Sequence, residues 1–268
     1  MSEGGLLAAD MFRAGRLGEA VEAAGAAVRR APADFGARFL LAELLLLAGN
    51  LERADVILDA AASFDPGAAV AIAEFRQLLR ADTARRQLHS DGRVPEFLDH
   101  PTPALTASLA AAVALRAGDC AAAKVRADEA EAIRPRVPGR RGDVSFDDFR
   151  DADDMYAGFF EVLTTTGKYY WIPTERVERM EFHPARRPRD LCWRRVSLSV
   201  RSGPDGDVYM PALYWSSDVG LSDALRLGRA TEWLEEEGSP VRGLGQRMFL
   251  AGDEAVEAGA LDVLEFIA

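Results

Sequence analysis

Histidine and cysteine, two residue types often used in catalysis and transition-metal binding, are rare in this chain: 268 residues include three histidines and two cysteines. His89, His100 and His183 are widely spaced, as are Cys120 and Cys192. None of them shows the close spacing of a zinc or other transition-metal site. His183 and Cys192 could meet as base and nucleophile, but neither stands in a recognisable nucleophile motif. The sequence therefore predicts no catalytic residue, no metal site and no cofactor.

Two further patterns resemble ligand-binding loops without meeting their requirements. Residues 243–246 match half of a dinucleotide loop, but the third glycine and the following helix are missing. We expect a tight bend or bulge in a strand there instead. The acidic cluster at 147–154 lacks the mid-loop glycine and the terminal glutamate of a calcium loop. We interpret it as the solvated start of a helix at Ser145, where acidic residues favour the helix dipole.

Arginine and tryptophan are residue types that dominate protein interfaces, and several of them in the second half of the chain are candidates for a binding site. The partner-binding candidates there are Trp193, Arg226, Arg229, Trp233 and Arg247. In the alternative interpretation, the arginine stems pack over the tryptophan rings and pair with acidic neighbours such as Glu232. Residue type alone leaves both interpretations open.

The charge balance excludes whole classes of partner. The net charge is −11 and the pI is near 4.9, and neither half carries a basic excess. Binding to nucleic acid or to an anionic membrane needs a basic face, so we expect neither partner. Residues 1–9 lack the basic start of a signal peptide, and the apolar run at 104–115 is too short to span a bilayer. With two distant cysteines expected to stay reduced, the sequence predicts a cytoplasmic protein.

Helices must position the candidate side chains of the first half, because a repeat runs through it. Four pairs lie 34 residues apart, which is the tetratricopeptide period: Gly15 and Gly49, Leu17 and Leu51, Ala20 and Ala54, Pro32 and Pro66. A third copy covers 117–135, and the unit between is degenerate, with one long helix expected over 68–90. Glycine permits the sharp turn between two helices, proline ends the second, and alanine lets them cross closely. Without this register, only a bundle of α-hairpins would be predicted.

A stack of such helix pairs presents a concave face, lined by the first helix of each pair. The candidates on that face are Phe12, Arg13, Phe39, Glu43, Leu46 and Leu47. An amphipathic helix laid into a hydrophobic groove is the expected binding mode. The alternative is that Leu46 and Leu47 pack on the neighbouring helix pair, since 40–47 is apolar on more than one side. If the groove binds the partner, residues 1–135 should suffice.

The second half is predicted to form a small, mostly antiparallel β domain. Strands are expected at 159–163, 168–172, 196–201, 208–214, 241–250 and 261–267, with a hairpin turn at 203–206 and a short helix at 222–227. The breaker-rich stretch 136–146 is the expected linker. The predicted fold is therefore α+β: tetratricopeptide-like helices over 1–135, then a β-rich domain over 147–268.

Four segments of the second half resemble one protein family. Residues 168–173 (KYYWIP), 189–194 (RDLCWR), 223–233 (DALRLGRATEW) and 241–247 (VRGLGQR) are similar to the ImpE/SciE (TagJ) family of type VI secretion accessory proteins. That family also joins tetratricopeptide-like helices to such a domain, so the resemblance covers the whole chain. Cys192 stands where an aliphatic residue is expected. The resemblance implies a cytoplasmic, non-enzymatic adaptor. Its implied partners are the small contractile-sheath subunit (TssB-like) and, directly or through it, the sheath-recycling AAA+ ATPase (ClpV-type).

Two rival functions stay open at this point. One is a small-molecule-binding or enzymatic β domain that uses the helices as a docking arm, and a pocket with perturbed titratable groups would favour it. The other is a general tetratricopeptide co-chaperone, whose carboxylate clamp needs paired lysine and asparagine residues on a groove that is mostly apolar here.

Overall fold

The computed structural model describes residues 3–218 and 220–267. Helices fill the first half and strands fill the second, so the predicted α+β class is confirmed. The helices are α1 (Glu3–Arg13), α2 (Leu17–Arg30), α3 (Phe35–Leu47), α4 (Leu51–Ala61), α5 (Ala69–Ser90), α6 (Pro103–Arg116), α7 (Cys120–Ile133) and α8 (Asp223–Arg226). Short 3₁₀ helices are η1 (Pro66–Ala68), η2 (Thr174–Arg176), η3 (Pro188–Leu191) and η4 (Ala258–Ala260).

The helix pairs form as the repeat predicts. Gly15, Gly49 and Gly118 stand in the turns of the pairs α1–α2, α3–α4 and α6–α7, with φ of 78°, 82° and 80°. Residues with a Cβ disfavour this left-handed backbone, so glycine fixes the place of each turn. Alanines at the helix crossings have no exposed surface: Ala8, Ala20, Ala42, Ala54, Ala61, Ala111 and Ala123 are each 0 % exposed. Close helix packing through these alanines is confirmed.

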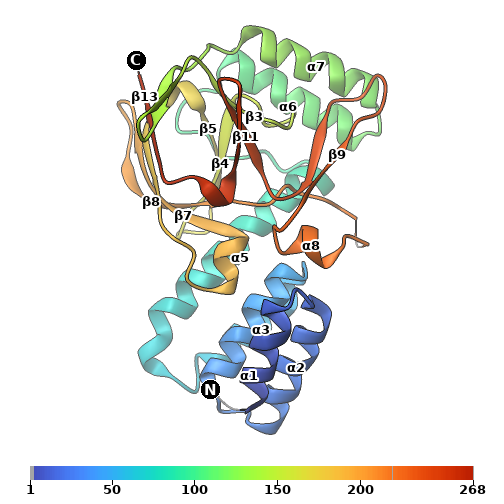
Figure 1. Ribbon diagram of the computed structural model, residues 1–268, viewed down its shortest axis with the longest axis vertical. Coiled ribbons are helices and arrows are strands. Elements are labelled where there is room, and N and C mark those ends of the chain that lie inside the picture. Colours follow the sequence, from blue (N-terminus) through green and yellow to red (C-terminus); the bar gives the residue numbers. More distant parts are fainter. Residues whose placement is uncertain (1–2, 219, 268) are drawn as a thin grey trace.

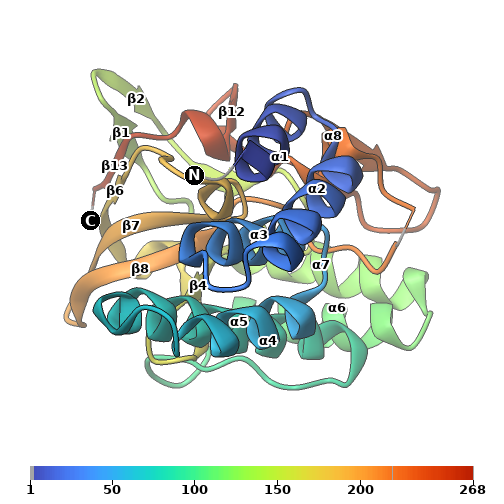
Figure 2. The same ribbon diagram turned by 90° about the horizontal axis from the view of Figure 1, so that it is seen from below.

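The expected long helix is α5, which crosses the middle of the molecule (Figure 1). The pairs α1–α2 and α3–α4 lie on one side of it, and Figure 2 shows α4 beside α5 from below. The third pair, α6–α7, lies at the other end of the molecule, next to the strands. The three helix pairs therefore do not form one uninterrupted stack, because α5 separates the third pair from the first two.

The strands form one large antiparallel sheet and two small ones. The strands are β1 (Gly139–Arg141), β2 (Val144–Phe146), β3 (Phe149–Asp151), β4 (Phe159–Leu163), β5 (Tyr169–Pro173), β6 (Val177–Phe182), β7 (Trp193–Val200), β8 (Asp205–Pro211), β9 (Thr231–Leu234), β10 (Arg242–Gly245), β11 (Met248–Ala251), β12 (Glu254–Glu257) and β13 (Val263–Phe266). The large sheet has the order β2-β1-β13-β6-β7-β8-β4-β5, and the small sheets are β12-β11-β3 and β10-β9. Phenylalanines pack between the large sheet and the three-stranded one: the Phe149 ring lies 5.2 Å from Phe249 and 5.5 Å from Phe266.

The segment around Ser145 differs from the sequence-based expectation. A helix starting there was expected, and this is wrong: β2 and β3 occupy 144–151. Asp148 accepts hydrogen bonds from the backbone nitrogens of Val137 (3.0 Å) and Phe149 (2.9 Å), which favours a loop over a helix start. The stretch 136–146, expected as a linker, holds β1 and β2, and β1 pairs with the C-terminal strand β13.

The helices and the strands share one hydrophobic core across α5. Phe39 on α3 contacts Phe75 on α5 at 5.5 Å between ring centroids, and Phe75 contacts Trp193 on β7 edge-on at 5.8 Å. Trp193 is only 2 % exposed. This row of aromatic rings ties the first two helix pairs to the sheet, since each ring is buried against the next.

Candidate functional site

An apolar groove of about 510 Å³ lies between the first helices of the two N-terminal pairs, the start of α5 and the η3 segment. Four of the six predicted concave-face residues line it: Phe12, Arg13, Phe39 and Glu43. Phe35, Leu40 and Ala71 add further apolar surface. Arg187 and Pro188 of the β half close one wall, so the helices of 1–135 alone do not complete the groove. Its apolar lining suits the nonpolar stripe of a helix or strand from another protein.

Glu43 is the one acidic side chain that lines this groove, and it is 4 % exposed. Burial raises the pKa of its carboxyl group to about 7, and the nearby Arg187 only partly opposes that rise. The Arg187 Nε lies 3.8 Å from Glu43 Oε1, which has no hydrogen-bond donor within the described residues. The guanidinium of Arg187 covers the Phe39 ring at 5.2 Å.

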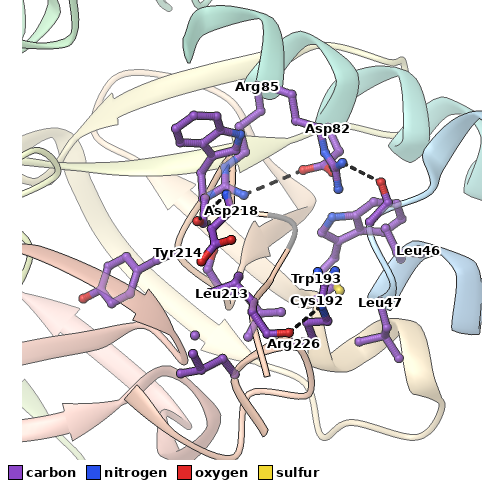
Figure 3. Close-up of a pocket in the computed structure, with 17 residues that line it drawn as sticks. Leu46, Leu47, Asp82, Arg85, Cys192, Trp193, Leu213, Tyr214, Asp218 and Arg226 are labelled. Atoms are coloured by element: carbon purple, nitrogen blue, oxygen red, sulfur yellow. Dashed lines mark hydrogen bonds and ion pairs between the residues drawn. The ribbon is translucent and has the colours of Figure 1, made fainter. Parts of the chain in front are cut away.

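Leu46 and Leu47, the other two predicted residues of α3, face a different space. They are 2 % and 4 % exposed and line a cavity of about 110 Å³ between α3, α5 and the β half. Figure 3 shows this cavity, which also takes lining from Trp193 and Arg226. Because α3 is buried on more than one side, its apolar run 40–47 serves both the groove and this internal cavity. The leucines have almost no surface left for a partner.

The α8 segment holds the ends of the first three helices. The Arg226 Nη1 donates to the carbonyl oxygen of Ala48 at 3.0 Å, just past α3. The Arg229 Nη2 donates to the carbonyl oxygens of Phe12 and Arg13 at 3.2 and 3.1 Å, at the end of α1. The Asp223 carboxylate accepts from the backbone nitrogen of Leu17 at 2.7 Å, at the start of α2.

Arg226 at the end of α8 and Arg229 just after it both bind carbonyl oxygens at helix C-termini, where the helix dipole favours a cation. Gly15 makes room for Arg229, whereas a side chain at Gly49 would be in ordinary contact with Arg226. A Cβ on Gly15 would lie 2.7 Å from Arg229 Nη1, and one on Gly49 would lie 3.6 Å from Arg226 Nη1. We call residues 223–229 the α8 clamp. Their intramolecular bonds give Arg226 and Arg229 a structural role, and partner binding through them stays a prediction.

Arg247 is buried in a network of charges between α5 and the sheet. Glu161 on β4 is 0 % exposed and receives the Nε and Nη2 of Arg85 from α5 at 2.9 and 3.0 Å. It also pairs with Arg247 and accepts from the Tyr169 hydroxyl at 2.5 Å. Burial favours a high pKa for the Glu161 carboxyl, but the two arginines outweigh burial and hold the pKa far below its usual value. The side chain is a fixed anion joining the two halves.

The remaining tryptophan candidate lies at the surface. Trp233 on β9 is 36 % exposed and contacts the Tyr214 ring at 5.9 Å. It is distant in the chain from every groove residue and does not line the groove.

The predicted site residues thus lie in five places. These are the groove (Phe12, Arg13, Phe39, Glu43), the cavity beside α3 (Leu46, Leu47, Trp193, Arg226), the α8 clamp (Arg226, Arg229), the buried network (Arg247) and the surface (Trp233).

Strongly raised pKa values occur in the β half, where burial is their main cause and the hydrogen bonds of the carboxylates are structural and oppose the rise. Burial raises the pKa of Asp153 to about 8 and that of Asp151 to about 6. Asp153 accepts from the backbone nitrogen of Gly243 at 2.8 Å, and Asp151 accepts from the Tyr214 hydroxyl at 2.8 Å. The Tyr214 ring fills the place where a Cβ of Gly243 would sit, at 2.1 Å. In the glycine motif at 243–246 the backbone thus approaches Tyr214 closely, and Asp153 of the acidic cluster at 147–154 holds the motif in place by a hydrogen bond.

The described part of the chain holds no group of three or more histidine, cysteine, aspartate or glutamate residues placed to bind a metal ion. His89 is stacked on Trp215 at 4.1 Å between ring centroids, and burial lowers its pKa to about 4.

Sequence reasoning missed Arg187 and Pro188 as groove residues. The signal was the Arg186–Arg187 pair between two prolines, an exposed basic turn in an acidic chain.

Comparison with known proteins agrees with this architecture. Residues 11–85 match a tetratricopeptide repeat model, and residues 143–265 match the model of the ImpE protein. The type VI secretion system accessory component TagJ of Pseudomonas aeruginosa is 30 % identical over 260 residues, covering 97 % of this chain and 90 % of that protein. A crystal structure of a Vibrio parahaemolyticus protein superposes with a TM-score of 0.91 at 26 % identity, covering 98 % of both chains.

The fold and the groove define a tetratricopeptide-type protein with an appended antiparallel β domain. The chain belongs to the ImpE/TagJ family of type VI secretion accessory proteins. Among the residues that the structure describes, no helix is both long enough and apolar enough to span a membrane.

Proposed function

We propose that this chain is a non-enzymatic, cytoplasmic adaptor of type VI secretion. It binds the small contractile-sheath subunit (TssB-like) through the groove and links that subunit to the sheath-recycling AAA+ ATPase (ClpV-type). The groove is the single observation that carries the proposal, because it is apolar, open and built partly by the repeat helices. The family to which the chain belongs supports the secretion role.

The occupant that suits the groove is an amphipathic segment of the sheath subunit. Phe12 and Leu40 are half-buried in the free protein and line the groove, so each has apolar surface left to give to a partner. Helix-in-groove recognition uses such surface for affinity. The wall formed by Arg187 and Pro188 implies that both halves of the chain contribute. We therefore expect the full chain, and not residues 1–135 alone, to bind with full affinity.

A binding assay with the sheath subunit of the same secretion system tests this proposal. When a partner binds, burying the surface that each half-buried side chain still exposes contributes about 1 kcal/mol. Phe12→Ser with Leu40→Ser removes two such contributions and should weaken binding by about thirtyfold. Val125→Ser is the matched control, because Val125 is 63 % exposed on α7, away from the groove. Circular dichroism should show unchanged helix content in both variants. Equal affinity of the double variant and the control would refute the groove as the binding site.

The link to the ATPase is tested separately by co-purification. The full chain, mixed with the sheath subunit and the ATPase, should yield a complex of all three. Omitting this chain should reduce the ATPase recovered with the sheath subunit. Recovery that does not depend on the chain would refute the linking role while leaving sheath binding intact.

A further inference from the structure

A second hollow, of about 550 Å³, adjoins the groove and shares Ala71 and Arg187 with it. Its lining includes four arginines, Arg186, Arg187, Arg189 and Arg195, and we call it the arginine recess. The chain as a whole carries a net charge of −11, so this concentration of positive charge is opposite to the general surface. A recess of this sign attracts anionic groups and repels cationic ones.

Arg186 and Arg187 are the two cations of the recess that remain available. Both are exposed, and neither side chain donates a hydrogen bond to a residue in the described ranges. The Oδ2 of the nearby Asp190 accepts from their backbone nitrogens, at 2.8 and 3.1 Å, and not from their guanidinium groups. Glu43 lies 3.8 Å from Arg187, beyond hydrogen-bond distance, and burial raises its pKa to about 7, so it is only partly ionised at neutral pH. The structure therefore leaves these two guanidinium groups without a full counter-charge.

Arg189, which is buried, also lacks a full counter-charge. Its side chain is 9 % exposed, and its Nη2 donates to Glu74 Oε1 at 2.8 Å. Its Nε and Nη1 have no hydrogen-bond acceptor among the residues described, and its nearest further contacts are Asp190 Oδ1 at 4.0 Å from Nε and the Phe75 ring at 5.2 Å. The Glu74 oxygen is shared with the Tyr209 hydroxyl, also at 2.8 Å. A buried cation with two unpaired nitrogens is costly, and an anion in the recess reduces that cost.

The start of α5 adds to the preference for an anion. Val70 and Ala71, in the first turn of this 22-residue helix, line the recess, and its N-cap residue Ala68 has no capping side chain. The N-terminus of a helix carries a partial positive charge, and this applies to α5 although the turn η1 precedes it and the Ala69 backbone nitrogen donates to the Pro66 carbonyl oxygen. The partial charge of the helix terminus and the charges of the arginines therefore both attract an anion into the recess.

We propose that the arginine recess binds a carboxylate of the segment whose apolar side chains occupy the groove. This inference rests on the proposed function and adds the chemistry and direction of the bound segment. Because groove and recess are contiguous, the segment carries an aspartate or glutamate directly beyond its apolar stripe. That acidic end lies beside Arg186 and Arg187, which bind carboxylates through charge-assisted hydrogen bonds.

The test compares two double variants of the full chain. Arg186→Gln with Arg187→Gln removes the two available charges of the recess. Arg126→Gln with Arg179→Gln removes two charges elsewhere, from side chains that are 53 % and 47 % exposed. In 50 mM NaCl the first variant should bind the sheath subunit at least tenfold more weakly than wild type, and the control within twofold. The difference should shrink in 500 mM NaCl, because salt screens exposed charges.

A second measurement identifies the carboxylate. Each acidic residue of the sheath-subunit segment is replaced by its amide, one at a time. One replacement should reproduce the tenfold loss and cause no further loss with the Arg186→Gln, Arg187→Gln variant. If that variant binds like its control, or if every amide replacement adds its full effect to it, the inference is overturned.

The outcome also separates this inference from the proposed function. If the groove variant Phe12→Ser, Leu40→Ser loses binding while the recess variant matches its control, only the recess inference fails. If wild-type protein does not bind the sheath subunit, or if the groove variant binds like wild type, the proposed function fails and the recess inference fails with it.

Discussion

Replacing Glu161 by glutamine removes the anion that joins α5 to the sheet. Glu161 is 0 % exposed, and its partners Arg85 and Arg247 have side chains that are 7 % and 1 % exposed. Glutamine keeps the shape but leaves Arg85 and Arg247 only their second partners, Asp82 at 3.8 Å and Asp151 at 3.2 Å. Removing one member of a buried ion pair costs about 3–5 kcal/mol, because the remaining charge stays buried with less compensation. We expect a loss of that size in the free energy of unfolding.

Thermal and urea unfolding at pH 7 measure this loss. For a chain of this size, about 3–5 kcal/mol corresponds to a fall in Tm of roughly 6–20 °C. Glu265→Gln is the control, since Glu265 pairs with Arg140 at the surface and its side chain is 34 % exposed. An exposed pair contributes less than about 1 kcal/mol. Equal stability of Glu161→Gln and Glu265→Gln would show that the buried network does not hold the two halves together.

Three further substitutions test single features. Ala54→Leu should cost about 1–3 kcal/mol by overpacking a helix crossing where Ala54 is 0 % exposed, and an unchanged Tm would contradict this placement. Gly15→Ala should cost about 1–2 kcal/mol because of its left-handed backbone, and urea unfolding should show a smaller cost when Arg229→Ala frees the space. Glu43 has a folded pKa of about 7, above the value of 4.5 for the unfolded chain, so its burial destabilises the fold increasingly from pH 4.5 to 7. Between pH 4.5 and 8, wild type should therefore lose about 3 kcal/mol more than Glu43→Gln, and parallel stability curves would rule this out.

The helical half could be predicted in detail because its determinants are local. Turn glycines such as Gly15 and crossing alanines such as Ala54 act within one helix pair, so their spacing in the sequence is also their spacing in space. The arrangement of α6–α7 across α5 could not be predicted in this way. It depends on contacts between this pair and the β half, as in the Arg134 to Asp148 ion pair just after α7, and no repeat spacing encodes such contacts.

The groove could be predicted in part. Phe12 and Phe39 occupy the expected face, because that face follows from the repeat register. Arg187 could not be placed there from the sequence, since its position depends on how the β half docks. The same limit applies to the arginines of the second half. Residue type marked Arg229 and Arg247 as interface residues, and they do lie at an interface, but it is the one between the two halves of this chain.

The α8 clamp has a consequence for how the protein is made on the ribosome. Leu17 and Asp223, which it joins, are 206 residues apart. At about 5–20 residues per second, the clamp segment is synthesised roughly 10–40 s after the helices that it caps. During that interval the first helix pairs have no Arg226 or Arg229 at their turns, and Phe39 and Phe75 have no Trp193 to pack against. The emerging N-terminal helices therefore expose apolar surface that general chaperones recognise, and the final shape of the groove forms only after the C-terminal half has been translated.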